Sequence, residues 1–232
     1  MPRAVITGGS AGFGHALSTA LAREGWQVYI TGRDQQALAA AAAPVSPGTI
    51  TPVAGDVTDA SHRDALVRAA AQDGPVDLLV NNASTLGRSP LPRVLDLDPD
   101  VFEALWKTNV GGPLALIRAL APHLTDGAAV VNISSDAAVE HYETWGGYAA
   151  TKAALDHLTL TLAAEQPDLR WYAFDPGDMR TRMHQDAFPG EDISDRPEPE
   201  TVVPTFLRLL RDRPASGRYR AADLSARTER TA

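Results

Sequence analysis

The sequence predicts an α/β fold in which a doubly wound parallel β-sheet carries helices on both faces. Short apolar segments alternate along the chain with longer segments of helical period, as in consecutive βαβ units. A glycine-rich turn joins the first strand to the first helix, and polar residues follow several later strands. Because parallel strands bind ligands beyond their carboxyl ends, these residues should share one edge of the sheet.

The first βαβ unit spans residues 3–33. The strand RAVIT leads into GGSAGFG, then a helix that Gly25 should cap, then the strand WQVYITGR. Gly8, Gly12 and Gly14 let backbone amides and the helix N-terminus approach a pyrophosphate. This context favours dinucleotide binding over a purely structural turn.

Cofactor preference depends on the end of the second strand. An acid there would bind a ribose 2′-hydroxyl, whereas an arginine would accept a 2′-phosphate. Arg33 occupies this place, and Asp34 reads as the N-cap of the next helix, QQALAAAAA. We therefore predict NADP(H) in preference to NAD(H), with Asp34 as the competing ribose contact.

Two more units extend the pattern. The strand TITPVAGDV ends near Asp56, a helix follows at 61–74, and the strand VDLLV runs into Asn81. Asp98 and Pro99 then indicate the start of a long helix that continues to residue 124. Because Asn109 is followed by two glycines and a proline, we expect a distorted turn inside that helix.

The second half of the chain follows the same plan. We predict strands at 128–134, 169–177 and 217–221, a central helix through residue 165, and a helix at 201–212. The strand at 128–134 brings Ser134 and Ser135 to the edge of the sheet. Residues 1–225 are expected to form one domain with a substrate lid at 178–200, and residues 226–232 a polar, mobile tail.

Tyr148 and Lys152 stand four residues apart on the central helix and should share one face. Of the 21 basic residues only Lys107 and Lys152 are lysines, so an ammonium appears where this chain otherwise uses arginine. A nearby ammonium should lower the pKa of Tyr148 and make it a proton donor or acceptor. An aromatic packed beside a solvated lysine is the alternative.

Composition limits the partners. The net charge of −8 argues against nucleic acid, and no apolar run has the length of a membrane span. The chain has no cysteine, and its six histidines lack ligand spacing, so we expect no metal. With a strand starting at Ala4, no signal peptide is expected, and a soluble cytoplasmic protein is predicted.

The order of seven elements along the chain resembles that of the classical short-chain dehydrogenase/reductase family. These elements are TGGSAGFG, Asp56, NNA, Asn109, the serine, YxxxK and PGxxxT. The resemblance covers essentially the whole chain. It implies a Rossmann-type sheet of about seven strands, homodimers or homotetramers, and NADP(H)-dependent interconversion of a carbonyl compound and an alcohol.

The resemblance also implies residue roles. Tyr148 would be the general acid/base, with Lys152, Ser135 and Asn109 as its partners. The implied cofactor contacts are Gly8, Ser10, Gly12, Phe13, Gly14, Arg33, Asp56, Val57, Asn81, Asn82, Ala83, Tyr148, Lys152, Pro176, Gly177, Met179 and Thr181. Trp145, Met183, His184 and Phe188 are candidates for an apolar substrate pocket, with lid packing as the alternative.

The chain departs from the family pattern in three places. Ser84 replaces the glycine usual after NNA, Ala138 stands where a glycine commonly follows the serine pair, and Asp175 replaces a frequent asparagine. None of these changes removes a catalytic group. A non-catalytic NADP(H)-binding regulator or scaffold is the main alternative function. An epimerase or dehydratase of the extended branch is disfavoured because such chains carry a longer C-terminal part.

Overall fold

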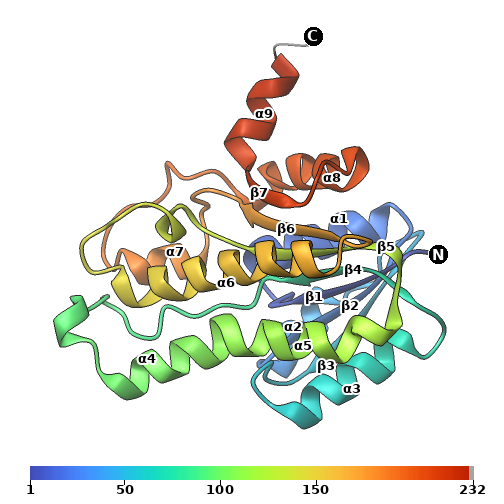
Figure 1. Ribbon diagram of the computed structural model, residues 1–232, viewed down its shortest axis with the longest axis horizontal. Coiled ribbons are helices and arrows are strands. Elements are labelled where there is room, and N and C mark those ends of the chain that lie inside the picture. The colour runs from blue at the N-terminus through green and yellow to red at the C-terminus, as the bar shows by residue number, and fades with distance from the viewer. Residues whose placement is uncertain (230–232) are drawn as a thin grey trace.

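The computed structural model describes residues 1–229, and side chains up to residue 225. Seven parallel strands form one sheet in the order β3-β2-β1-β4-β5-β6-β7 (Figure 1). They are β1 (Arg3–Thr7), β2 (Gln27–Gly32), β3 (Thr49–Ala54), β4 (Val76–Asn81), β5 (Leu124–Ile133), β6 (Arg170–Asp175) and β7 (Gly217–Arg220). The order changes direction between β1 and β4, which is where doubly wound sheets bind ligands. The predicted fold class is confirmed.

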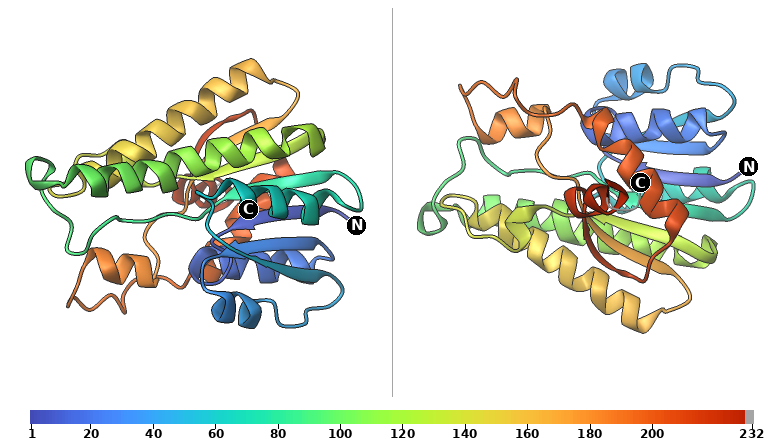
Figure 2. Two further views of the ribbon diagram at one scale, coloured as in Figure 1. Left: turned by 90° about the horizontal axis from the view of Figure 1, so that it is seen from below. Right: turned by 90° about the horizontal axis from the view of Figure 1, so that it is seen from above.

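Helices cover both faces of the sheet (Figures 1 and 2). The α-helices are α1 (Gly12–Arg23), α2 (Gln35–Ala41), α3 (Ala60–Ala71), α4 (Pro99–Trp106), α5 (Gly112–Leu120), α6 (Gly146–Glu165), α7 (Arg182–Ala187), α8 (Val203–Asp212) and α9 (Ala221–Glu229). A π-helix, η2 (Lys107–Gly111), joins α4 to α5. Single 3-10 turns are η1 (Val94–Asp96), η3 (Ala121–His123), η4 (Asp136–Ala138) and η5 (Pro199–Thr201).

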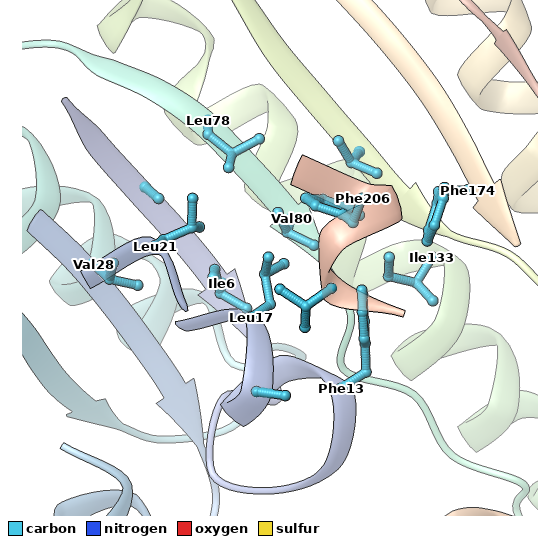
Figure 3. Packing of buried hydrophobic residues seen from close by; sticks show 14 of the residues in the cluster. Ile6, Phe13, Leu17, Leu21, Val28, Leu78, Val80, Ile133, Phe174 and Phe206 are labelled. Atoms are coloured by element: carbon cyan, nitrogen blue, oxygen red, sulfur yellow. The ribbon is translucent and has the colours of Figure 1, made fainter. Parts of the chain in front are cut away.

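Two apolar layers hold these helices against the sheet. In the first, α1, α2 and α8 pack on one face, and the ring of Phe206 meets those of Phe13 and Phe174 at centroid distances of 5.7 and 5.2 Å (Figure 3). In the second, α3, α5 and α6 pack on the other face around Trp171 and Leu116. Each such side chain contributes about 1.5–3 kcal/mol by leaving water.

The caps predicted from the sequence are present. The Asp34 carboxylate accepts from the amides of Gln36 and Ala37 at 2.9 and 3.0 Å, which fixes the start of α2. Asp98 accepts from the Asp100 amide before Pro99, and Gly25 follows α1 with φ +88°.

The distortion expected around Asn109 is present, because a π-helix at 107–111 interrupts the helix. Three elements differ from prediction. The helix expected up to residue 124 ends as α5 at Leu120 and is followed by a 3-10 turn at 121–123. Strand β5 begins at Leu124 rather than residue 128, with a register shift against β4. The expected C-terminal tail forms α9 through residue 229, because Ala221 packs with the α8 layer; residues 230–232 of that tail lie outside the described part. Among the described helices, none has the length and apolar character to cross a membrane.

Candidate active site

A cavity of about 590 Å³ lies at the carboxyl ends of the strands, between the glycine turn and α7. It is lined at one end by Arg33 and Asp56 and at the other by Ser135, Tyr148 and Lys152. These residues come from distant parts of the chain, and the parallel topology brings them to one edge of the sheet.

The glycine turn is held in place by polar contacts with the residues that directly follow β4. The Thr7 hydroxyl accepts from the amides of Asn82 and Ala83, both at 2.9 Å, and the Asn82 side chain donates to the carbonyls of Thr7 and Gly8 at 2.9 and 3.1 Å. Gly8 and Gly12 have φ of +66° and +53°, a region that favours glycine. A Cβ at Gly12 would lie 3.3 Å from the Thr181 methyl group, so a larger residue there would crowd the turn against Thr181.

The N-terminus of α1 fits an anion. Ala11 occupies the N-cap position without a side-chain cap bond, and the first turn of α1 carries no acid. The amides at this end therefore point toward the cavity without a side chain of the described residues capping them. Amides so arranged, with the helix dipole behind them, suit a pyrophosphate.

Three of the predicted cofactor contacts have other positions. Gly14 does not line the cavity. A Cβ at this position would lie 2.3 Å from the Gly8 carbonyl oxygen, so a glycine is needed for α1 to pack closely against the glycine turn. The ring of Phe13 lies in the core, which leaves its backbone to border the cavity. Asn81 was expected at the edge of the sheet, but its buried side chain donates to Asn132 at 2.8 Å.

At the outer end of the cavity, Arg33 is exposed, whereas Asp34 is used as a helix cap. Burial alone would raise the pKa of Asp56, but hydrogen bonds from Thr58 and the charge of Arg33 lower it, so the carboxylate stays ionised. Arg33 therefore borders this end of the cavity, whereas Asp34 does not line it and uses its Oδ1 to cap α2. Ser10, Val57, Pro176, Gly177 and Met179 also line the cavity.

At the inner end, Tyr148 and Lys152 project from α6 and are buried, with exposed fractions of 7% and 2%. The Lys152 Nζ lies 5.5 Å from the centroid of the Tyr148 ring and donates to the Ile133 carbonyl at 2.8 Å. The two side chains therefore share one face of the helix, as the spacing predicted, with the ammonium over the ring.

The predicted lowering of the Tyr148 pKa is wrong for this structure. Burial raises the pKa of Tyr148, although contacts with the hydroxyls of Ser84 and Ser135 oppose the rise. Burial also lowers the pKa of Lys152 to about 8, and the charge of Asp156 only partly opposes this. The sequence spacing could not reveal how far burial disfavours the charged forms of both side chains.

Asn109 lies within the π-helix, buried beneath the cavity rather than lining it. Its side chain accepts from the Ser84 hydroxyl and the Thr85 amide at 3.1 and 2.9 Å, and donates to the Thr85 carbonyl and the Thr151 hydroxyl, both at 3.0 Å. Asn109 thus ties the segment after β4 to α6, one turn of helix from Tyr148. Every polar atom of its side chain is paired, so its placement is well defined.

Sequence reasoning missed an ion-pair network under the site. Arg218 of β7 donates to Asp156 at 2.9 Å, to Asp175 at 3.1 Å and to the Ser135 carbonyl at 2.9 Å. Ser134 donates to the same Asp156 oxygen at 2.8 Å, so its hydroxyl is engaged with Asp156 although the residue borders the cavity. The departure at Asp175 is the sequence signal that could have indicated a buried basic partner.

Aromatic and sulfur side chains border the substrate end. Trp145 packs edge-to-face on Tyr148 with centroids 5.7 Å apart, and Met183 and His184 line the same space. Phe188 stands behind them: its ring contacts Trp145 and His184 at 5.8 and 4.9 Å, but it does not line the cavity.

The doubly wound sheet, the uncapped helix behind a glycine turn, and the cavity between them define a dinucleotide-binding α/β protein. The family model for short chain dehydrogenases matches residues 2–192. The uncharacterized oxidoreductase YciK of Escherichia coli K12 is 30% identical over 217 residues, covering 90% of this chain and 85% of that protein. The chain therefore belongs to the short-chain dehydrogenase/reductase family of oxidoreductases.

Solved structures agree in fold. A structure described as a short chain dehydrogenase of Shigella flexneri, complexed with NADP, superposes with a TM-score of 0.88 at 27% identity, covering 95% of this chain and 97% of that one. One from Escherichia coli CFT073, complexed with NADPH, has a TM-score of 0.87 at 28% identity, with 95% and 96% coverage.

Proposed function

We propose that this protein interconverts a ketone or aldehyde and an alcohol by hydride transfer, using NADP(H). The observation that carries the proposal is that Ser135, Tyr148 and Lys152 line the same cavity as the glycine turn. A phenol, a hydroxyl and an ammonium are thereby brought to the place where a carbonyl beside a nicotinamide would react. The NADP and NADPH complexes of similar structures support the choice of nucleotide.

The residues of this chain fit a nucleotide that carries a 2′-phosphate. The amides of the glycine turn would receive the pyrophosphate, and Arg33 would receive the 2′-phosphate. Thr181, at the N-cap of α7, lies across the turn from Gly12 and would border the nicotinamide end. When bound, the nicotinamide supplies or accepts the hydride.

Proton transfer falls to Tyr148. Its raised pKa keeps the phenol protonated near neutral pH, so it can donate a proton to the alkoxide that develops during reduction. Ser135 would donate to the same oxygen and orient the carbonyl. Lys152, whose ammonium group donates to the Ile133 carbonyl, would keep a positive charge over the Tyr148 ring as the phenolate forms.

The test is NADPH consumption with a panel of aromatic and aliphatic ketones. Wild-type protein should oxidise NADPH with at least one class of ketone, and Tyr148→Phe should lower kcat by about 10²–10⁴. Tyr219→Phe, which removes a distant hydroxyl bonded to the Ala215 carbonyl, serves as the matched control and should keep activity. Full activity in Tyr148→Phe would contradict the assignment, and nucleotide binding without turnover would favour a non-catalytic regulator.

We further propose that the chain forms a homo-oligomer through α4 and α6. Phe102 and Trp106 on α4 and Leu160 on α6 leave large apolar side chains exposed, with Trp106 44% accessible. Such faces suit a self-complementary interface. Light scattering after size-exclusion chromatography should give a multiple of 24.7 kDa, and Phe102→Ser with Trp106→Ser should reduce it. A monomer at all concentrations would contradict this proposal.

A further inference from the structure

A carboxylate forms part of the cavity wall beside Ser135. Asp136, the first residue of the 3-10 turn η4, accepts from the Ser135 hydroxyl at 3.0 Å and from the Ala137 amide at 2.8 Å through Oδ1. Its Oδ2 accepts from the Tyr142 hydroxyl at 2.9 Å. The amide bond serves the turn, but the two hydroxyl bonds fix the carboxylate at the substrate end of the cavity.

This carboxylate keeps capacity for a ligand. An ionised carboxylate offers about four acceptor positions, and the bonds from Ser135, Ala137 and Tyr142 use three of them. Oδ1 takes two of these bonds and Oδ2 takes one, so one acceptor position remains on Oδ2. When Ser135 gives its single proton to a substrate oxygen, as the proposed function requires, its bond to Asp136 is given up and Oδ1 also gains an acceptor position. A donor on the substrate is the chemistry that would fill these positions.

Other acids strengthen the negative field here. The hydrogen bond to Asp136 is the main reason why the pKa of Tyr142 is raised, and the charges of Glu140 and Asp178 act in the same direction. Asp178 also lines the cavity. A carboxylate on the substrate would therefore meet like charge at this end.

The nearby arginines are turned to other partners. Arg182 borders the cavity, but its side chain is 93% exposed and lies 3.8 Å from Asp186. Arg180 is bonded to Glu198, and Arg196 pairs with Asp178 and Asp195. None of these three is placed by the structure to neutralise an anion beside Ser135.

We infer that Asp136 is a specificity-determining residue that selects carbonyl compounds carrying a hydroxyl or ammonium donor on the carbon next to the carbonyl, and disfavours 2-oxo acids. The inference rests on the proposed function, since it takes Ser135 as the residue that holds the substrate oxygen. With the Ser135 proton on the substrate oxygen, Oδ1 has a free acceptor position 3.0 Å from Ser135 Oγ, a separation that suits polar substrate atoms on adjacent carbons. Trp145 and Met183, on the same cavity, suit an apolar remainder.

The experiment compares four aromatic ketones that differ only beside the carbonyl. They are α-hydroxyacetophenone, α-aminoacetophenone, α-methoxyacetophenone and benzoylformate. The methoxy group cannot donate a hydrogen bond because its oxygen carries no hydrogen, and benzoylformate is an anion. The kcat/KM for each is measured with NADPH for wild type, Asp136→Asn and Glu140→Gln. For each ketone, the kcat/KM of the variant is divided by the kcat/KM of wild type. This ratio is then divided by the same ratio for the methoxy ketone, so that intrinsic reactivity and any general effect on Ser135 cancel.

With Asp136→Asn, the normalised value should fall about tenfold for the amino ketone and rise about tenfold for benzoylformate, because a charged hydrogen-bond partner is lost. The hydroxy ketone should fall less, since asparagine still accepts a hydrogen bond. Glu140→Gln removes the same charge without lining the cavity, and its values should stay within about twofold. Equal values for all four ketones, or the same pattern in Glu140→Gln, would overturn the inference.

Two controls separate this inference from the proposed function. Thermal melting of each variant establishes that it is folded, and Asp136→Ser repeats the test with a smaller side chain. If no ketone is reduced by any protein, the proposed function fails. The same four ketones are then titrated against the protein with NADPH by tryptophan fluorescence, where equal affinities in wild type and Asp136→Asn would overturn the role of Asp136 by itself.

Discussion

Replacing Lys152 with methionine should stabilise the fold while removing the proposed activity. Lys152 is buried, and desolvation lowers its pKa to about 8 against an ordinary value of 10.5. Between those values the unfolded chain holds a proton that the folded protein lacks. Stability therefore rises as the pH increases through this window, and the full cost of burying the lysine is present below pH 8.

The magnitude follows from the shift. A difference of roughly 2.5 pKa units corresponds to about 3 kcal/mol of destabilisation at pH 7. Methionine fills similar volume without charge, but it leaves the Ile133 carbonyl without its donor, at a cost of about 1 kcal/mol. Lys152→Met should therefore raise the free energy of unfolding by about 2 kcal/mol at pH 7.

Urea unfolding of wild type and variant at pH 7 and pH 9.5 measures this. The gap between the two proteins should shrink by roughly 2 kcal/mol at the higher pH, because the wild-type lysine has by then lost its proton in the folded state. Lys107→Met is the matched control: Lys107 is exposed and paired with Glu103, which raises its pKa, so its gap should not change over this range. A variant less stable than wild type at pH 7, or a gap equal at both pH values, would refute the reasoning.

Two further predictions concern the two ends of the cavity. Arg33→Ala should weaken NADPH binding by about 10–100-fold and leave NADH binding nearly unchanged, because a charged hydrogen bond to the 2′-phosphate is lost. Titration followed by nicotinamide fluorescence measures both affinities, with Arg182→Ala as the control. Equal losses of affinity for both nucleotides would contradict the role of Arg33. Ser84→Gly removes a contact that lowers the pKa of Tyr148, so the phenol becomes a weaker acid and kcat for ketone reduction at pH 7 should fall severalfold. An unchanged or higher kcat would exclude this role for Ser84.

Local chemistry allowed much of the fold to be predicted. The glycine turn, the Asp34 and Asp98 caps and the distortion at Asn109 depend on neighbouring residues only, and each is present. The helix α9 could not be predicted, because its polar sequence is held by packing against α8. Strand β5 begins early for a similar reason: pairing with β4 extends it through Gly127, which local propensity would place in a turn.

The sequence predicted which residues gather at the site better than it predicted their pKa values. Spacing placed Tyr148 and Lys152 on one face of α6, but the direction of the Tyr148 pKa depends on burial by elements far away in sequence. Asn81 and Asn82 are adjacent and chemically identical, so sequence could not decide which side chain faces the glycine turn. Arg218 could not be predicted as a partner of Asp156, because their contact depends on the pairing of β7 with β6.

In the proposed reaction NADPH gives a hydride to the carbonyl carbon while Tyr148 gives a proton to the carbonyl oxygen. The most direct measurement follows the hydride itself: NADPH carrying deuterium at both C4 positions of the nicotinamide is mixed with a reactive ketone, and the alcohol is analysed by mass spectrometry. Wild-type protein should deliver deuterium to the carbinol carbon, and Tyr148→Phe should bind NADPH with similar affinity yet transfer deuterium about 10²–10⁴ times more slowly. Alcohol without deuterium, or equal transfer by Tyr148→Phe, would contradict the account.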